Sequence, residues 1–452
     1  MDTFPVSVSF REALRFWLQL GLISFGGPAG QIAIMHRELV DKRRWVSEKR
    51  FLHALNFCMV LPGPEAQQLA TYLGWLMHRT WGGVLAGTLF FLPSLALLIG
   101  LSWIYMAFGQ QPLVAGIFYG IKPAVAAIVL HALHRIASRS LGHPLQAPAP
   151  WAIAALSFIA IWLFKLPFPL VVLAAMLTGT ALARWAPGSL GHGKAHGAAA
   201  QGAHEPALID DDTPTPPHAL FSRSRLAKVL LAGAALWLLP MAALFFSYGW
   251  SGTLTQMGWF FTKAALLTFG GAYAVLPYVN QAAVGHYEWL TTAQMMDGLA
   301  LGETTPGPLI MVVAFVGFVG GWVKQVAGPD ALFLGAALAA CVATWFTFLP
   351  SFIFILAGGP WVESTRGNLQ LTAPLAAVTA AVVGVIANLA LFFIAAIAYP
   401  LGAAGLAARP DWAALALAVV AALALWRLKW GVMTVIAASA AAGLLLRGVG
   451  LA

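Results

Sequence analysis

Two acidic residues lie beside Pro-Gly-Pro sequences within apolar stretches of this chain. Glu65 directly follows Pro62-Gly63-Pro64, and Glu303 lies three residues before Pro306-Gly307-Pro308. An ionisable side chain inside an apolar segment is a functional candidate by default. Because Glu65 is expected to begin a helix and Glu303 to end one, the helix dipole favours the charge of Glu65 and disfavours that of Glu303. Glu303 is therefore predicted to be the better proton carrier, although either side chain could instead cap a backbone group.

The Pro-Gly-Pro sequences themselves predict broken helices. Proline removes a backbone donor and ends a helix, and such breaks survive in lipid where they line a cavity. The half-helices that begin at Pro64 and Pro308 would point partly positive amides at a shared space, which is an anion site without side chains. Phe25-Gly26-Gly27-Pro28 and Phe269-Gly270-Gly271 offer the same feature again, since glycine permits close backbone approach. Tight turns between helices are the alternative.

Further polar residues could complete such a site. Lys122 and Lys263 lie within apolar stretches, where each could pair with a dianion, with Glu65 or Glu303, or extend its amine to the lipid interface. Four other side chains could hydrogen-bond either an oxyanion or a freed carbonyl: Gln67, Gln68, Thr304 and Thr305.

The composition is that of a membrane protein. The 452 residues are 60% hydrophobic and 9% charged, with a mean hydropathy of +0.81, whereas a soluble domain carries about 25% charged residues. Continuous apolar runs at 81–107, 226–248, 371–399 and 431–446 approach the roughly 20 residues that a spanning helix needs. The runs do not alternate, so helices are favoured over barrel strands.

Charge and cysteine content exclude other classes. The net charge of +9 arises mostly in loops between apolar segments, as expected of cytoplasmic loops rather than of a nucleic-acid binder. Cys58 and Cys341 are too few for a disulfide framework or a cysteine metal site. No phosphate loop, His-Glu-x-x-His sequence or nucleophile elbow indicates an enzyme, and no cofactor is expected.

The sequence repeats internally. Ser24-Phe25-Gly26-Gly27 recurs as Thr268-Phe269-Gly270-Gly271, and the first Pro-Gly-Pro recurs as the second, both at an offset of 244. Leu92-Pro93-Ser94 recurs as Leu349-Pro350-Ser351 at an offset of 257. Repeats at fixed offsets indicate a tandem duplication. We expect an all-α polytopic membrane protein with two repeats, broken or re-entrant helices and about 13 membrane segments.

Loop charges indicate that the repeats have opposite topology. The stretch 37–50 holds six basic residues, while its counterpart 281–294 holds no Lys or Arg, so one belongs in the cytoplasm and the other outside. The expected organisation has four parts: repeat 1–186, a cytoplasmic linker 187–225, a linking span 226–249 and an inverted repeat 250–452. A parallel repeat with chance loop charges is the alternative.

The linker is the one long polar segment. It is rich in Gly, Ala and Pro, and it contains Asp210-Asp211-Asp212 and four histidines, His192, His196, His204 and His218. Irregularly spaced histidines beside acids could bind a metal. A flexible connection between two duplicated halves is the favoured interpretation, and no metal site is assigned.

The motifs together resemble those of the chromate ion transporter family in its long two-domain form. In the first half the resemblance rests on Phe25-Gly26-Gly27-Pro28, Glu38 with Arg44-Trp45, and Leu61 to Ala70. In the second half it rests on Phe269-Gly270-Gly271, Trp289-Leu290 and Gly302 to Pro308. The resemblance covers nearly the whole chain except the linker and the far C-terminus.

The resemblance implies chromate export from the bacterial cytoplasm across the inner membrane, driven by the proton gradient, with sulfate as a related or competing anion. We therefore expect a multi-pass secondary transporter, not an enzyme. A permease that imports sulfate or another oxyanion and an anion channel are the alternatives that share every motif. The sequence leaves a homodimer open.

Overall fold

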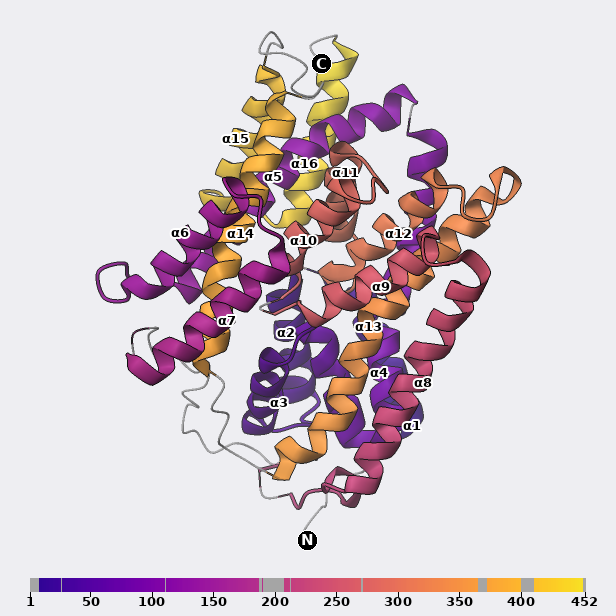
Figure 1. Ribbon diagram of the computed structural model, residues 1–452, viewed down its shortest axis with the longest axis vertical. Helices are drawn as coiled ribbons and strands as arrows, with labels where there is room; N and C mark the ends of the chain where they lie inside the picture. Colours follow the sequence, from indigo (N-terminus) through magenta and orange to yellow (C-terminus); the bar gives the residue numbers. More distant parts are fainter. Residues whose placement is uncertain are drawn as a thin grey trace.

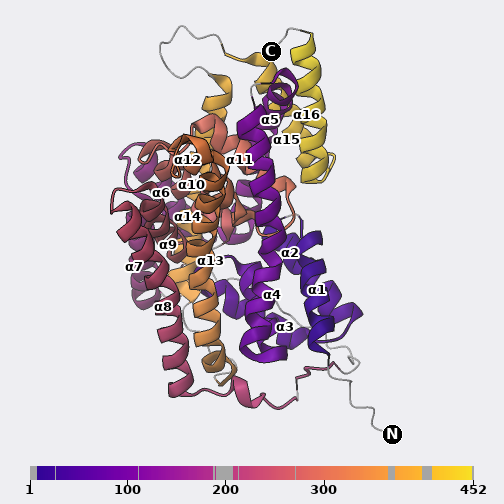
Figure 2. The same ribbon diagram turned by 90° about the vertical axis from the view of Figure 1, so that its right-hand side faces the viewer.

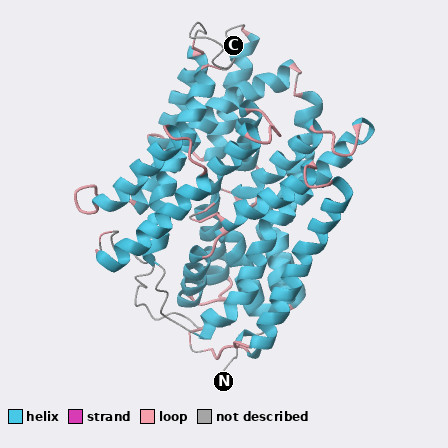
Figure 3. Cartoon of the chain, in the orientation of Figure 1, coloured by secondary structure: helices cyan, strands magenta, loops and turns pink. Residues whose placement is uncertain are grey.

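The computed structural model describes residues 8–25, 27–109, 111–186, 189, 207–211, 213–269, 271–364, 372–399 and 410–449. Within these ranges the chain folds almost entirely into helices (Figure 3), with one isolated bridge between Val46 and Ile209 in place of a sheet. The molecule is elongated, with α1 in its lower part and α16 at its top in the view of Figure 1. The prediction of an all-α polytopic membrane protein is confirmed.

The first half contains seven helices. They are α1 (Phe10–Ile23), α2 (Gly27–His36), α3 (Glu48–Val60), α4 (Glu65–Phe108), α5 (Pro112–Ser140), α6 (Pro148–Trp162) and α7 (Phe168–Trp185). A π-helical turn, η1 (Arg37–Lys42), follows α2, and a short 3-10 turn, η2 (Pro217–Ala219), precedes the linking helix α8 (Arg223–Tyr248).

The second half repeats this order. Its helices are α9 (Thr253–Leu266), α10 (Ala272–Gly285), α11 (Thr292–Thr304), α12 (Val312–Val323), α13 (Leu332–Ser364), α14 (Thr372–Ala398), α15 (Trp412–Trp426) and α16 (Val432–Gly448). The 3-10 turns η3 (Leu309–Met311) and η4 (Pro329–Ala331) precede α12 and α13. The one difference in order is that α4 is a single helix where the second half has α12 and α13. A kink with non-helical backbone at His78 and Arg79 divides α4 at the corresponding place.

Six of the described helices are long and apolar enough to cross a membrane: α4, α5, α7, α8, α13 together with η4, and α14. Four shorter ones are also apolar, namely α6, η3 with α12, α15 and α16. The predicted count of about 13 membrane segments also includes some of the short paired helices, and it stays a prediction.

The two halves exchange their last helices. In the first half α6 and α7 pack on α14, while α15 and α16 pack on α5, as both views show (Figures 1 and 2). The crossing of α5 and α16 is close, because a methyl group at Gly120 would lie 1.9 Å from the carbonyl oxygen of Ser439. Small residues allow such close helix contacts in membranes. The short helix α11 also packs on α5 of the other half.

Candidate functional site

The Pro-Gly-Pro break of each half is hydrogen-bonded to the Phe-Gly-Gly turn of the other half. The backbone amide of Gly63 donates to the carbonyl of Thr268 over 2.7 Å, and the amide of Gly307 donates to the carbonyl of Ser24 over 2.7 Å. Both donors and both acceptors are 244 residues apart. The two bonds are therefore equivalent, and all four breaks predicted from the sequence meet in one region.

Serine side chains from the long helices border these breaks. A methyl group at Gly63 would lie 2.4 Å from Oγ of Ser351, and one at Gly307 would lie 2.8 Å from Cβ of Ser94. The φ angles are +132° at Gly63 and +107° at Gly307, where side chains are rarely accommodated. Only glycine fits both the backbone and the space. The two serines are 257 residues apart, so this contact too occurs once in each half.

Several buried polar atoms around the breaks lack a hydrogen-bond partner among the described residues. Gln31 donates through Nε2 to the carbonyl of Gly307, but its Oε1 has no partner. Five buried side-chain atoms near the breaks have no partner among the described residues: Oγ of Ser24 and Ser94, and Oε1 of Gln31, Gln67 and Gln68. Buried polar groups usually have partners, so these atoms are candidates to bind water or a polar ligand.

Helix N-termini open onto the same region. Pro64 caps α4, which begins at Glu65, and Pro308 caps η3, which leads into α12. The first turn of a helix leaves amides without backbone partners, and the dipole adds positive potential there. Both half-helices begin where the sequence predicts.

The Phe-Gly-Gly turns also adopt glycine-specific backbone. The φ angles of Gly27 and Gly271 are +69° and +93°, at the points where α2 and α10 begin. Phe25 is exposed at the end of its turn, whereas Gly26 and Gly270 lie outside the described residues.

Glu65 lies between the two Phe-Gly-Gly turns. A methyl group placed on Gly271 would be 4.0 Å from both Oε1 of Glu65 and Cγ of Pro28. Glu65 is partly buried, and no hydrogen bond or ion pair joins it to any described residue. It is thus an unpaired carboxyl group at the start of a half-helix.

Glu303 has a different environment. It is buried near the C-terminal end of α11, where it accepts a hydrogen bond from the hydroxyl of Tyr273 on α10. The guanidinium of Arg135 on α5 also acts on it electrostatically. The neighbouring hydroxyls of Thr304 and Thr305 donate to carbonyls of their own helix, Leu301 and Gly302. Their hydroxyls therefore bond to backbone carbonyls in this structure, as Gln68 does by donating to the carbonyl of Pro62 over 2.8 Å.

The two lysines have other partners than the glutamates. Nζ of Lys122 lies 3.5 Å from Oδ2 of Asp297 on α11, and the hydroxyl of Tyr105 donates to the same oxygen over 2.8 Å. Lys263 lies over the ring of Trp259, 5.8 Å from its centroid. The structure therefore pairs Lys122 with a third acid, Asp297, and does not join Lys263 to the breaks.

Comparison with known proteins assigns the family. The sequence profile described as "Chromate transporter" matches residues 11–180 and 255–444, which is one match in each half. The chain belongs to the chromate transporter family.

Three curated relatives cover most of the chain. A chromate transport protein of Pseudomonas aeruginosa is 34% identical over 407 residues, which are 85% of this chain and 81% of that protein. One from Cupriavidus metallidurans is 28% identical over 84% of this chain and 81% of its own length. A probable chromate transport protein of Synechococcus elongatus is 28% identical over 84% of this chain and 83% of its own length. No solved structure shows a significant match.

Arg50 and Glu363 form a buried ion pair that the sequence of this chromate transporter family member does not predict. Nη1 of Arg50 donates to Oε2 of Glu363 over 2.8 Å, with side-chain exposures of 6% and 1%. The hydroxyl of Tyr72 donates to the other oxygen of Glu363. In the sequence Arg50 is one of six basic residues in the stretch 37–50. The sequence signal for its partner is an acid at the end of a long apolar run.

The last part of the linker is docked against the basic loop of the first half. The amides of Leu208 and Ile209 donate to the carbonyls of Arg44 and Trp45, over 2.9 and 3.0 Å. Nη2 of Arg50 donates to the carbonyl of Thr213 over 2.8 Å. Ile209 and Ala219 are buried in the core of the first half. His192, His196, His204 and Asp212 lie outside the described residues.

Proposed function

We propose that this protein is a secondary active transporter that carries chromate out of the cytoplasm, across the bacterial inner membrane, in exchange for protons. Family membership supports chromate as the substrate, and the named relatives are chromate transport proteins. The observation that carries the proposal is the reciprocal hydrogen bonding of the four breaks around unpartnered polar atoms. Paired breaks in corresponding positions of two halves are typical of transport sites.

Chromate is a tetrahedral dianion whose oxygens need donors. The helix N-terminal amides that follow Pro64 and Pro308 and the hydroxyls of Ser24 and Ser94 provide donors without a fixed cation. The glutamine oxygens near the breaks would accept from water or from a protonated oxyanion. Such a site holds sulfate for the same reasons, so sulfate is the expected competitor.

Proton coupling is assigned to Glu303 and Glu65. In the sequence Glu65 directly follows the first Pro-Gly-Pro break, and Glu303 precedes the second. Glu65 also lies beside the Phe-Gly-Gly turns without a partner among the described residues. Exchange requires that these carboxyl groups bind protons from outside after the anion has left, and release them to the cytoplasm before the next anion binds. Anion movement would then be linked to the protonation state of the site.

Two polar networks would close the site at opposite ends. Arg50 on α3 pairs with Glu363 on α13, and Lys122 on α5 pairs with Asp297 on α11. Each pair joins the first half to the second. Figure 1 places α3 below and α11 above the central short helices α2 and α10. Alternating access requires that one end open while the other is closed, and these pairs are the candidate closures.

The proposal is tested by labelled chromate uptake into everted membrane vesicles, with and without an imposed proton gradient and with excess sulfate. Export coupled to protons requires gradient-dependent accumulation that sulfate reduces. Accumulation indifferent to the gradient would indicate a channel or exchanger. Accumulation only in right-side-out vesicles would indicate an importer.

Glu303→Gln is expected to reduce gradient-driven accumulation at least 10-fold and to leave chromate exchange measurable, because the amide keeps the shape but cannot carry a proton. Glu288→Gln, at an exposed glutamate outside the breaks, is the control and should retain accumulation. Equal loss of exchange and accumulation in Glu303→Gln would count against a coupling role.

A further inference from the structure

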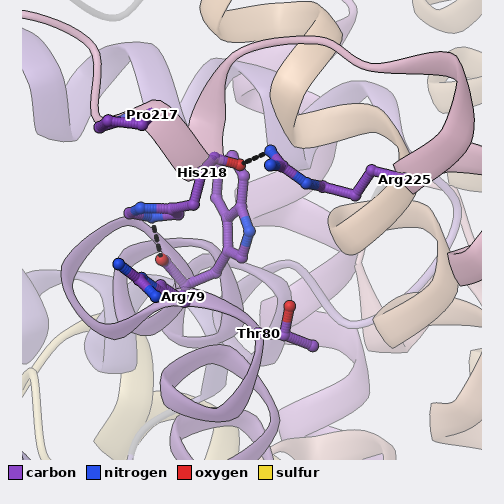
Figure 4. Close-up of a pocket in the computed structure, with 6 residues that line it drawn as sticks. Arg79, Thr80, Pro217, His218 and Arg225 are labelled. Atoms are coloured by element: carbon purple, nitrogen blue, oxygen red, sulfur yellow. Dashed lines mark hydrogen bonds between the residues drawn. The ribbon is translucent and has the colours of Figure 1, made fainter.

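A polar pocket lies away from the breaks, at the kink of α4. It has a volume of about 340 Å³ and is lined by Trp75, Arg79, Thr80, Pro217, His218 and Arg225 (Figure 4). Its walls come from the kink of α4, the turn η2 at the end of the linker, and the start of α8. Trp75 is ten residues beyond Glu65, or about 15 Å along the helix.

The pocket concentrates positive charge. Arg79 and Arg225 line it together with His218, whose pKa is lowered by burial, and none of its lining residues is acidic. Figure 4 shows Arg79 beside the imidazole of His218 and Arg225 on the other side of that residue. Converging cations in a partly enclosed space repel one another unless an anion offsets them. The arrangement therefore favours an anionic occupant.

The hydrogen bonds of the pocket leave several guanidinium donors unused. Nη1 of Arg225 donates to the carbonyls of His218 and Leu220, so this guanidinium is held in place with its other nitrogens available. Nε2 of His218 donates to the carbonyl of Trp75 over 3.0 Å. Arg79 makes no hydrogen bond or ion pair with any described residue.

Arg79 is held in an unfavourable backbone conformation. Its φ and ψ angles are 57° and −159°, a region that is essentially restricted to glycine. This conformation interrupts α4 and brings Arg79 to the pocket wall. Strain of this kind persists where the surrounding structure enforces it, and it is concentrated at binding sites.

The surroundings of the pocket are those of a membrane surface. Trp81, Leu220 and Phe221, next to the lining residues in sequence, are exposed, and Arg223 is an exposed cation at the start of α8. Exposed aromatic residues beside basic ones are typical of the lipid interface, where anionic headgroups bind.

We propose that the pocket formed by Arg79, Thr80, His218 and Arg225 is a binding site for a phosphate-type oxyanion, supplied by an anionic lipid headgroup or by free inorganic phosphate. The oxyanion bridges Arg79 of α4 and Arg225 of α8. It thereby fastens the end of the linker and the linking helix to the first half. This site is separate from the proposed chromate site and does not depend on it.

The test measures thermal unfolding of the purified full-length protein. One arm titrates inorganic phosphate against sodium chloride at equal ionic strength, and the other compares phosphatidylglycerol with phosphatidylcholine. We expect the melting temperature to rise in at least one arm, and Arg79→Gln to weaken that response at least 10-fold. Arg223→Gln is the matched control, because this exposed arginine lies two residues from Arg225 but does not line the pocket.

The two arms identify the source. A response to phosphate without one to phosphatidylglycerol assigns a free oxyanion, and the reverse assigns a lipid headgroup. No response in either arm, or equal losses in Arg79→Gln and Arg223→Gln, would overturn the proposal.

Arg79→Gly separates binding from folding. Glycine tolerates the φ and ψ of this position, so the variant should melt at a higher temperature than the parent protein when no oxyanion is present. It should also show no oxyanion response. A response of normal size in Arg79→Gly would overturn the role of the Arg79 side chain.

Discussion

Gly63 and Gly307 show how single residues determine the geometry of the candidate transport site. Each donates its amide across the two halves, and each has a positive φ beside a serine of a long helix. The amide provides the contact between the halves, while the missing side chain leaves room for the serine. Neither the positive φ nor the close serine leaves room for a Cβ atom.

Gly63→Ala is accordingly expected to destabilise the protein by about 2 kcal/mol or more, from backbone strain and the contact with Ser351. Gly100→Ala is the control, because a methyl group at Gly100 meets no atom within 4 Å and alanine is the better helix former. Thermal unfolding in detergent measures both. A Gly63→Ala protein as stable as Gly100→Ala would show that this position has room for a side chain.

At the scale of elements, the buried pair of Arg50 and Glu363 joins the beginning of α3 to the end of α13. Removing one partner of a buried pair leaves an uncompensated charge, at a cost of about 3–5 kcal/mol. Arg50→Met and Glu363→Met should each lower stability by about that amount, and the double variant should recover part of the loss. Thermal unfolding and chromate binding are the measurements.

The matched comparison is an exposed pair. Lys42 lies 2.8 Å from Glu38, and the side chain of Lys42 is 58% exposed. Exposed pairs contribute about 0–1 kcal/mol, so Lys42→Gln should change stability little. If Arg50→Met were no more destabilising than Lys42→Gln, the pair could not act as a closure between the halves.

At the scale of the molecule, the proposed opposite topology of the halves has a direct test. Lys42 and His286 are equivalent positions at the 244-residue offset, and both are exposed. In a background without Cys58 and Cys341, we expect a cysteine at position 286 to react with an impermeant thiol reagent in spheroplasts. A cysteine at position 42 should react only in everted vesicles. Labelling of both from the same side would establish a parallel repeat.

The local breaks were predictable because their causes are local. Proline at residues 62 and 64 ends a helix, and glycine permits the turn, so the start of α4 at Glu65 follows from residue types alone. The same holds for the start of η3 after Pro308. Repetition at a constant offset added that the two breaks are equivalent.

The partners of the charged residues were not predictable in this way. The sequence allows Lys122 to pair with Glu65 or Glu303, yet the structure places it beside Asp297, 175 residues away in the chain. Arg50 and Glu363 are 313 residues apart. Such pairs depend on how the long helices cross, and a hydropathy pattern carries no information about that crossing.

The sequence by itself determined the helical class, the positions of the breaks and the duplication, because apolar length, proline and glycine act within a few residues. Only the tertiary structure decided that each Pro-Gly-Pro contacts the opposite Phe-Gly-Gly turn, that the end of the linker docks on the basic loop, and that Arg79 and Arg225 share a pocket. The physical reason is that these contacts join segments that are distant in the chain. Such segments come together only when the long helices, among them α4, α8 and α13, pack against one another.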